Sequence, residues 1–110
     1  MNLSAKQCTP CQGGVEPIDE ARAAEMRAQV PRWSLANSGK LIERCYKRKN
    51  FADALELVNR IGEIAEQEGH HPDIKFGWGY VTVEFFTHKI GGLHENDFIM
   101  AAKVNELVEP

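Results

Sequence analysis

The segment from Asn50 to Gly69 constrains the fold most strongly, because its pattern predicts one long helix. Asn50 is a favourable N-cap, the acid Asp53 follows three residues later, and Gly69 is the kind of residue that ends helices. Apolar residues recur at helical spacing between these ends, which predicts a single buried face. The residues of this predicted face are Phe51, Ala54, Leu55, Val58, Ile61, Ile64 and Ala65.

Segments with strand character lie in pairs before and after this helix. Before it, residues 33–36 and 40–47 flank Asn37-Ser38-Gly39, a turn with the length and composition that joins antiparallel strands. After it, residues 73–76 and 80–87 are separated by a turn with two glycines, and the second segment is rich in β-branched and aromatic residues. The sequence therefore predicts two hairpins, one before and one after the long helix.

Two further segments have helical patterns. Residues 18–30 are rich in strong helix formers and end before Pro31, and residues 96–107 keep helical periodicity close to the end of the sequence. The predicted order is helix, two strands, helix, two strands, helix. Hairpins separated by one long helix favour an α+β fold, in which a four-stranded antiparallel sheet has three helices packed on one face.

Length and charge limit the number of domains and the kinds of partner. With 110 residues, the chain predicts a single domain over residues 15–110, preceded by a mobile leader over residues 1–14. The net charge of -3 argues against binding nucleic acid or an anionic membrane through bulk electrostatics. Neither a secretory signal nor a long apolar run is present in the sequence, so we expect a soluble, cytoplasmic protein.

The leader contains two cysteines, Cys8 and Cys11, at a spacing that also occurs in zinc and redox motifs. A structural zinc site needs about four ligands, and Cys45 is the only other cysteine in the sequence. Because cytosolic thiols stay reduced, we expect two reduced thiols here. The alternatives are a zinc ion shared between subunits and a local disulfide.

Three of the four histidines lie where the long helix meets the second hairpin. His70 and His71 follow the helix directly, and His88 follows the last strand. Imidazole has an unperturbed pKa of about 6.5 and therefore gives and takes protons near neutral pH. The pattern predicts an acid/base site; its structural alternative is a set of solvated loop histidines or a cation at a helix C-terminus.

A set of residues around these histidines has a specific spacing. Its members are Glu66, His70, His71, Pro72, Trp78, Tyr80, Thr87, His88, Gly92, Leu93 and Asp97. This set resembles the pterin-4a-carbinolamine dehydratase family, also known as a dimerisation cofactor of a homeodomain transcription factor. The resemblance extends from about residue 33 to the C-terminus and covers the leader poorly. It implies a fold of four antiparallel strands and three helices, and assembly into homodimers or homotetramers through sheet edges and helices.

The resemblance also implies an activity, the dehydration of 4a-hydroxytetrahydropterin to quinonoid dihydropterin. This reaction recycles the pterin cofactor of aromatic amino acid hydroxylases. The leaving hydroxyl must be protonated and a ring nitrogen must lose a proton, so the reaction needs an acid and a base rather than a metal or a redox cofactor. By resemblance, His70 and His88 would transfer the protons and His71 would orient the pterin. These three are the predicted catalytic residues; we expect no metal, and no cofactor besides the pterin substrate.

Four other residues are predicted to bind the substrate. Glu66 lies in the last helical turn and can reach back to a histidine, or else it is an exposed helix carboxylate. Pro72 and Thr87 could present backbone groups to the polar edge of the pterin. Asp97 is either a ligand-side carboxylate or an acid at a helix N-terminus, and the second role is slightly favoured. His94 stands where the family commonly has Ser or Thr, and we expect it to be a substituted helix cap.

Two other functions compete with the dehydratase. A metal hydrolase would use the histidines as zinc ligands, but the side chains of His70 and His71 point to opposite faces if their segment is extended. A non-catalytic binding or dimerisation module that acts as a regulatory cofactor would not need all three histidines. The sequence therefore favours the dehydratase.

Overall fold

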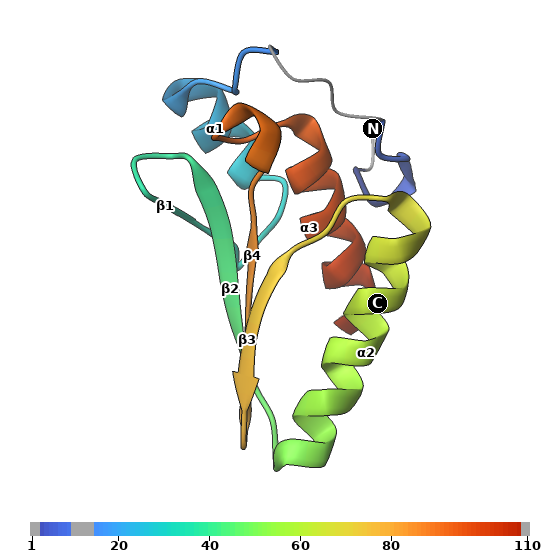
Figure 1. Cartoon of the computed structure of the whole chain (residues 1–110). Coiled ribbons are helices and arrows are strands. Elements are labelled where there is room, and N and C mark those ends of the chain that lie inside the picture. Colours follow the sequence, from blue (N-terminus) through green and yellow to red (C-terminus); the bar gives the residue numbers. More distant parts are fainter. Residues whose placement is uncertain (1–2, 10–14, 109–110) are drawn as a thin grey trace.

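The structure is a computed structural model that describes residues 3–9 and 15–108 (Figure 1). It confirms the predicted α+β fold, with four antiparallel strands in the sheet order β1-β2-β4-β3. Among the described residues, no helix has the length and apolar character needed to cross a membrane. The helices and strands are η1 (Leu3–Ala5), α1 (Glu20–Arg27), β1 (Ser34–Ala36), β2 (Leu41–Lys47), α2 (Phe51–Glu68), β3 (Asp73–Gly77), β4 (Tyr80–Phe85), η2 (His88–Ile90) and α3 (Glu95–Val108).

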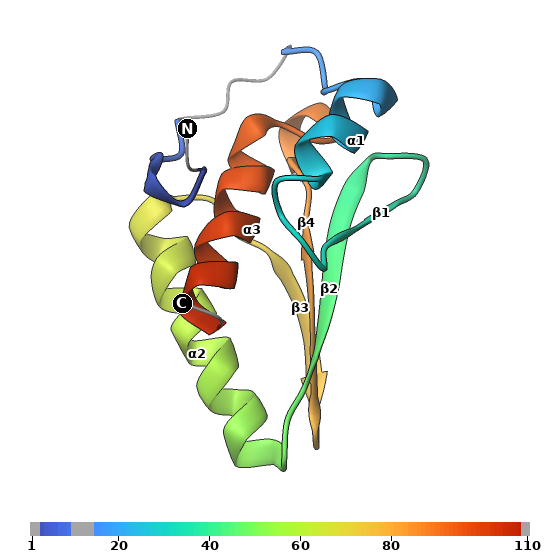
Figure 2. The ribbon, with the colours of Figure 1, turned by 180° about the vertical axis from the view of Figure 1, so that it is seen from behind.

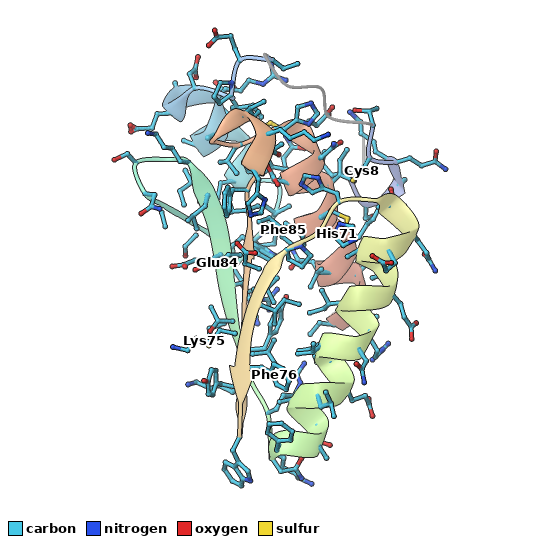
Figure 3. The ribbon with its side chains drawn as sticks, viewed as in Figure 1. Cys8, His71, Lys75, Phe76, Glu84 and Phe85 are labelled. Atoms are coloured by element: carbon cyan, nitrogen blue, oxygen red, sulfur yellow. The ribbon has the colours of Figure 1, made fainter. Side chains whose placement is uncertain are left out.

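The two faces of the sheet have different surroundings. Helices α2 and α3 lie along one face, whereas the opposite face has no helix from the described residues over it (Figures 1 and 2). Buried and half-buried residues alternate along β4, as expected for a strand with one face toward a core. Figure 3 shows the result: Phe76 and Phe85 point toward the helices, and Lys75 and Glu84 point away from them.

The ends of α2 lie where the sequence predicted them, and they direct the chain into the histidine pair. The side chain of Asn50 accepts a hydrogen bond from the backbone N–H of Asp53 at 2.8 Å. At the other end, Gly69 has a φ of 66°, the left-handed conformation that glycine adopts at low cost. The backbone N–H of His70 still donates to the carbonyl of Ala65, at 3.2 Å. The helix end therefore determines where the histidine pair begins.

The buried face of α2 differs in part from the predicted one. Leu57, which was absent from the predicted face, is buried, whereas Phe51 and Leu55 are 47% and 39% exposed. The ring of Phe51 lies 5.5 Å from that of Phe76, which is on the edge strand β3. Because the sheet ends at β3, side chains on that flank of α2 are only partly covered.

The last predicted strand ends two residues early, and this change shapes the site. The prediction placed residues 80–87 in one strand, but β4 ends at Phe85. Thr87 instead pairs with Gly92, and its N–H donates to the Gly92 carbonyl at 2.8 Å. This pairing closes a short loop that contains η2, and His88 is the first residue of η2.

The first half of α3 is buried on all sides. Residues 96–102 are all buried, because β4, α2 and η1 all contact this helix. Leu3 in η1 belongs to the hydrophobic core. Residues 3–9 of the expected leader thus pack against the domain; the mobility of residues 1–14 and the boundary at residue 15 stay predictions, and residues 10–14 lie outside the described residues.

Candidate active site

All three predicted catalytic histidines line one cavity of about 270 Å³. The cavity lies where the end of α2, the segment after β4 and the N-terminal segment meet. Of the residues predicted to bind substrate, Pro72 and Thr87 line it, whereas Glu66 and Asp97 are outside its lining and contact its histidines. The complete lining is Thr9, Gly69, His70, His71, Pro72, Asp73, Phe86, Thr87, His88 and Lys89.

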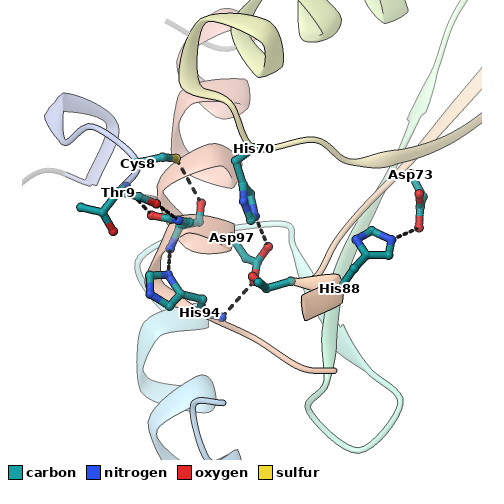
Figure 4. A network of polar contacts seen from close by, with 9 residues as sticks. Cys8, Thr9, His70, Asp73, His88, His94 and Asp97 are labelled. Carbon is teal, nitrogen blue, oxygen red and sulfur yellow. Dashed lines mark hydrogen bonds and ion pairs between the residues drawn. The ribbon is translucent and has the colours of Figure 1, made fainter. Parts of the chain in front are cut away.

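His70 is held at the buried side of the cavity by Asp97. Its Nε2 lies 2.6 Å from Oδ1 of Asp97, and its side chain is only 10% exposed (Figure 4). The ring of Phe85 stacks on the imidazole, with 6.4 Å between ring centroids. Because a carboxylate only accepts hydrogen bonds, Nε2 of His70 carries a proton and Nδ1 is the nitrogen that can accept another. The surroundings therefore select one tautomer.

The carboxylate of Asp97 joins three parts of the site. Besides His70, it accepts hydrogen bonds from the hydroxyl of Thr87 at 2.8 Å and from the backbone N–H of His94 at 2.9 Å. In return, Nδ1 of His94 accepts from the N–H of Asn96 at 3.0 Å, which completes a capping box at the start of α3. Asp97 is completely buried. Asp97 is thus an acid in the first turn of α3 whose carboxylate contacts His70, and its predicted role in substrate binding stays a prediction. His94 is the helix cap that the sequence predicted.

His71 has a different carboxylate partner and a different exposure. Its Nε2 forms a hydrogen bond with Oε2 of Glu66, and the two side chains are 59% and 78% exposed. The expected contact between Glu66 and a histidine is therefore present, but it reaches His71. The left-handed turn at Gly69 ends the helix, so the usual four-residue spacing does not apply to the residue that follows it.

His88 lies at the open side of the cavity. Its Nε2 is 3.5 Å from Oδ2 of Asp73, and its ring centroid is 4.0 Å from that of Phe86. Its side chain is 60% exposed. In the described part of the chain, the three cavity histidines therefore each pair with a separate carboxylate, one buried and two exposed to solvent.

The sequence prediction missed five residues of the cavity wall, which are Thr9, Gly69, Asp73, Phe86 and Lys89. Asp73 follows Pro72 directly and Lys89 follows His88, so their position beside predicted site residues was a usable signal. Thr9 had no such signal, because it comes from the N-terminal segment and reaches the site only through tertiary packing.

Metal binding has no geometric support within residues 3–9 and 15–108, where no three His, Cys, Asp or Glu side chains are grouped to hold an ion. Cys11 lies outside the described residues. The reduced state of Cys8 and Cys11, and the alternatives of a shared zinc ion or a disulfide, stay predictions.

Cys8 lies beside the site, and its thiol is held in the protonated form. Burial, reinforced by the negative charge of Glu68, raises the pKa of Cys8 from 9.0 to about 12. The folded protein therefore binds this proton more tightly than the unfolded chain does. The resulting stabilisation is present below pH 9 and is lost as the pH rises from 9 toward 12.

We expect the Cys8 thiol to react slowly with alkylating reagents, because the thiolate is the nucleophile. At pH 8, iodoacetamide should modify Cys8 at least about tenfold more slowly than the exposed Cys45. Mass spectrometry on variants that retain one cysteine each measures both rates, and equal rates would contradict the burial.

Cys8→Ser, which keeps the size and polarity of the side chain, should change turnover little.

Comparison with known proteins identifies relatives over nearly the whole chain. A protein of Methylococcus capsulatus is 56% identical over 106 residues, which cover 96% of this chain and 93% of the relative. One of Halorhodospira halophila is 57% identical over 107 residues, covering 97% and 98%. Both are named as candidate pterin-4-alpha-carbinolamine dehydratases.

Two solved structures share the fold. A transcriptional coactivator/pterin dehydratase from Brucella melitensis matches with a TM-score of 0.77 and 27% identity, over 84% of this chain and 98% of that one. A pterin dehydratase-like protein described as a RuBisCO assembly factor in the alpha-carboxysome matches with a TM-score of 0.59 and 20% identity, over 70% and 89%. This second likeness concerns the fold alone.

A family-level match agrees with these relatives. Residues 16–107 match the model of the family described as pterin 4 alpha carbinolamine dehydratase. This range includes every predicted site residue and excludes the segment that contributes Thr9. The chain therefore belongs to the pterin 4 alpha carbinolamine dehydratase family, the family of hydro-lyases that its sequence predicted.

Proposed function

We propose that the protein dehydrates 4a-hydroxytetrahydropterin to quinonoid dihydropterin by histidine acid/base catalysis. The observation that carries this proposal is the convergence of His70, His71 and His88 on one cavity from two separate segments. In the reaction the bond between C4a and the hydroxyl oxygen breaks as that oxygen takes up a proton. The adjacent ring nitrogen loses its proton and becomes doubly bonded to C4a, and one water leaves. A donor and an acceptor of protons are therefore sufficient.

His70 and His88 are the proposed proton-transfer pair. Asp97 holds Nε2 of His70, so Nδ1 is the nitrogen left to take or return a proton. His88 lies across the same cavity beside Asp73, where its exposed ring can exchange protons with solvent. In this proposal His71 orients the pterin with the help of Glu66, and the backbone of Pro72 and Thr87 meets the polar edge of the ring.

The wider biological role belongs to the same proposal. The product can be reduced to the tetrahydropterin that aromatic amino acid hydroxylases use, and the pterin is a substrate rather than a bound cofactor. We propose that the protein is cytoplasmic. We also propose that it forms a homodimer or homotetramer, because β1 and β3 are edge strands whose unpaired backbone groups can join a second copy. The acidic net charge favours neither direct nucleic acid binding nor binding to an anionic membrane.

Stopped-flow ultraviolet absorbance on freshly generated 4a-hydroxytetrahydropterin tests the activity. Catalytic amounts of the protein should accelerate the appearance of quinonoid dihydropterin over the spontaneous reaction, because positioned histidines supply both proton transfers. A folded protein that gives no acceleration would contradict the dehydratase. It would favour the alternative, a non-catalytic binding or dimerisation module that acts as a regulatory cofactor.

A further inference from the structure

The N-terminal segment reaches the proposed active site although the family match begins only at residue 16. Thr9 lines the cavity of the three histidines. Figure 4 shows Thr9 on one side of His70, with Asp73 and His88 on the other side. We propose that residues 3–9 form a strap that supplies one wall of the pterin site, and that Asn96 latches this strap and thereby positions the substrate. This inference rests on the proposed pterin site.

The latch is a pair of hydrogen bonds between Asn96 and the backbone of Thr9. The N–H of Thr9 donates to Oδ1 of Asn96 at 3.0 Å, and Nδ2 of Asn96 donates to the carbonyl of Thr9 at 2.6 Å. Asn96 is only 2% exposed. A side-chain amide has a donor and an acceptor in the same arrangement as a peptide group, so one residue satisfies both backbone groups of Thr9.

The latch and the support of His70 belong to the same helical turn. Asn96 and Asp97 are consecutive residues in the first turn of α3: Asn96 holds the strap and Asp97 holds His70. The capping box through His94 fixes this turn. The position of the strap relative to His70 is therefore set by one short, well-anchored piece of backbone.

Further contacts hold the rest of the strap against the helices. The N–H of Cys8 donates to Oε1 of Glu68 at 2.8 Å, and Lys6 forms an ion pair with Glu95 at 2.6 Å. Leu3 is buried in the hydrophobic core. Since these contacts do not depend on a ligand, the wall is in place before the pterin arrives, and binding does not require ordering the segment.

A wall that is already in place should act on substrate binding more than on proton transfer. The strap contributes no histidine and no carboxylate to the cavity lining. Loosening it should therefore raise the KM for the carbinolamine and the Kd for a stable pterin while kcat changes little. A change that raises KM and Kd but leaves kcat nearly the same marks a positioning residue, whereas the loss of a catalytic residue lowers kcat.

Two variants that break the latch from opposite sides test the proposal. Asn96→Ala removes the side-chain amide, and Thr9→Pro removes the backbone N–H that donates to Oδ1 of Asn96. Each should weaken the binding of a stable 7,8-dihydropterin and raise KM by about tenfold. We expect kcat to stay within about twofold of the wild-type value. Fluorescence titration measures the Kd, and the stopped-flow assay measures KM and kcat.

The double variant and a matched control sharpen this test. If both changes break one latch, Asn96→Ala with Thr9→Pro should weaken binding no more than either change alone. Asn59→Ala makes the same chemical change at an exposed position of α2 and should leave Kd and KM unchanged. Thr9→Pro leaves α3 intact, so it tests the latch even if Asn96→Ala disturbs that helix.

The outcomes separate this inference from the proposed function. If the wild-type protein is active but both single variants keep its Kd and KM, the strap is overturned and the dehydratase is not. Effects of the two changes that multiply in the double variant would also overturn the strap. A wild-type protein that binds the dihydropterin without turnover would contradict the dehydratase, while the Kd values still test the strap. If the folded wild-type protein neither binds the dihydropterin nor turns over the carbinolamine, both the dehydratase and the strap are contradicted.

Discussion

Replacing His70 or His88 with alanine should lower kcat for pterin dehydration by roughly 100- to 10,000-fold, the usual contribution of one positioned acid or base. Each histidine is expected to handle one of the two protons that must move when water leaves. The uncatalysed dehydration still proceeds, so the rate should fall toward the spontaneous rate and not to zero. Stopped-flow absorbance at saturating carbinolamine measures the effect directly.

A second substitution at His70 separates lost chemistry from lost stability. Because Nε2 of His70 bonds the buried Asp97, alanine would leave one carboxylate oxygen without its donor. His70→Gln retains an N–H donor near that position but cannot transfer a proton at neutral pH. We therefore expect His70→Gln to unfold in urea close to the wild-type midpoint while its kcat falls as in His70→Ala.

A histidine outside the cavity provides the matched control. His94 caps α3 through Nδ1, and asparagine is itself a favourable cap. His94→Asn should therefore keep both the fold and most of the turnover. Wild-type turnover in both His70→Ala and His88→Ala would remove these residues from the catalytic assignment.

Asp97→Asn should lower kcat by about 100-fold through its effect on His70. The carboxylate accepts from His70, Thr87 and the N–H of His94, whereas an amide has one accepting oxygen and one donating nitrogen. The amide nitrogen cannot accept from its present donors, so His70 should lose its fixed tautomer or its position. Because Asp97 is completely buried, we expect KM to change less than kcat.

A combined variant shows whether Asp97 acts through His70. In the His70→Gln background, Asp97→Asn should cause little further loss of kcat, since the residue through which it acts has already been replaced. A full and independent loss in that background would show a separate role for Asp97, such as direct contact with the pterin. The predicted substrate-binding role would then be the correct one.

The stability of Asp97→Ala gives a second measurement of the same network. Alanine leaves three buried or half-buried donors without their acceptor, and each unmet buried group costs about 1–3 kcal/mol. We therefore expect Asp97→Ala to lower the free energy of unfolding, measured in urea, by about 3 kcal/mol or more. A loss below about 1 kcal/mol would show that water replaces the carboxylate at the start of α3.

The parts of the fold that the sequence predicted well depend on neighbouring residues. Asn50 and Gly69 cap α2 as expected, because a helix end is determined by the backbone and side-chain groups of a few adjacent positions. The alternation along β4 likewise follows from the two-residue period of a strand. The buried face of α2 was less accurate, because the exposure of Phe51 and Leu55 depends on where the sheet ends.

The order of helices and strands follows from local patterns in the sequence, and the family follows from the resemblance carried by the spaced motif residues. The same motif supplied the three histidines that line the cavity, and their catalytic role stays a prediction. The folded structure was needed to show which carboxylate pairs with each histidine, that Asp97 holds His70, and that Thr9 belongs to the cavity wall. These contacts join residues that are distant in the chain, such as Thr9 and Asn96. They form only when the core brings α3, the loop after β4 and the N-terminal segment together, and no local pattern records such an arrangement.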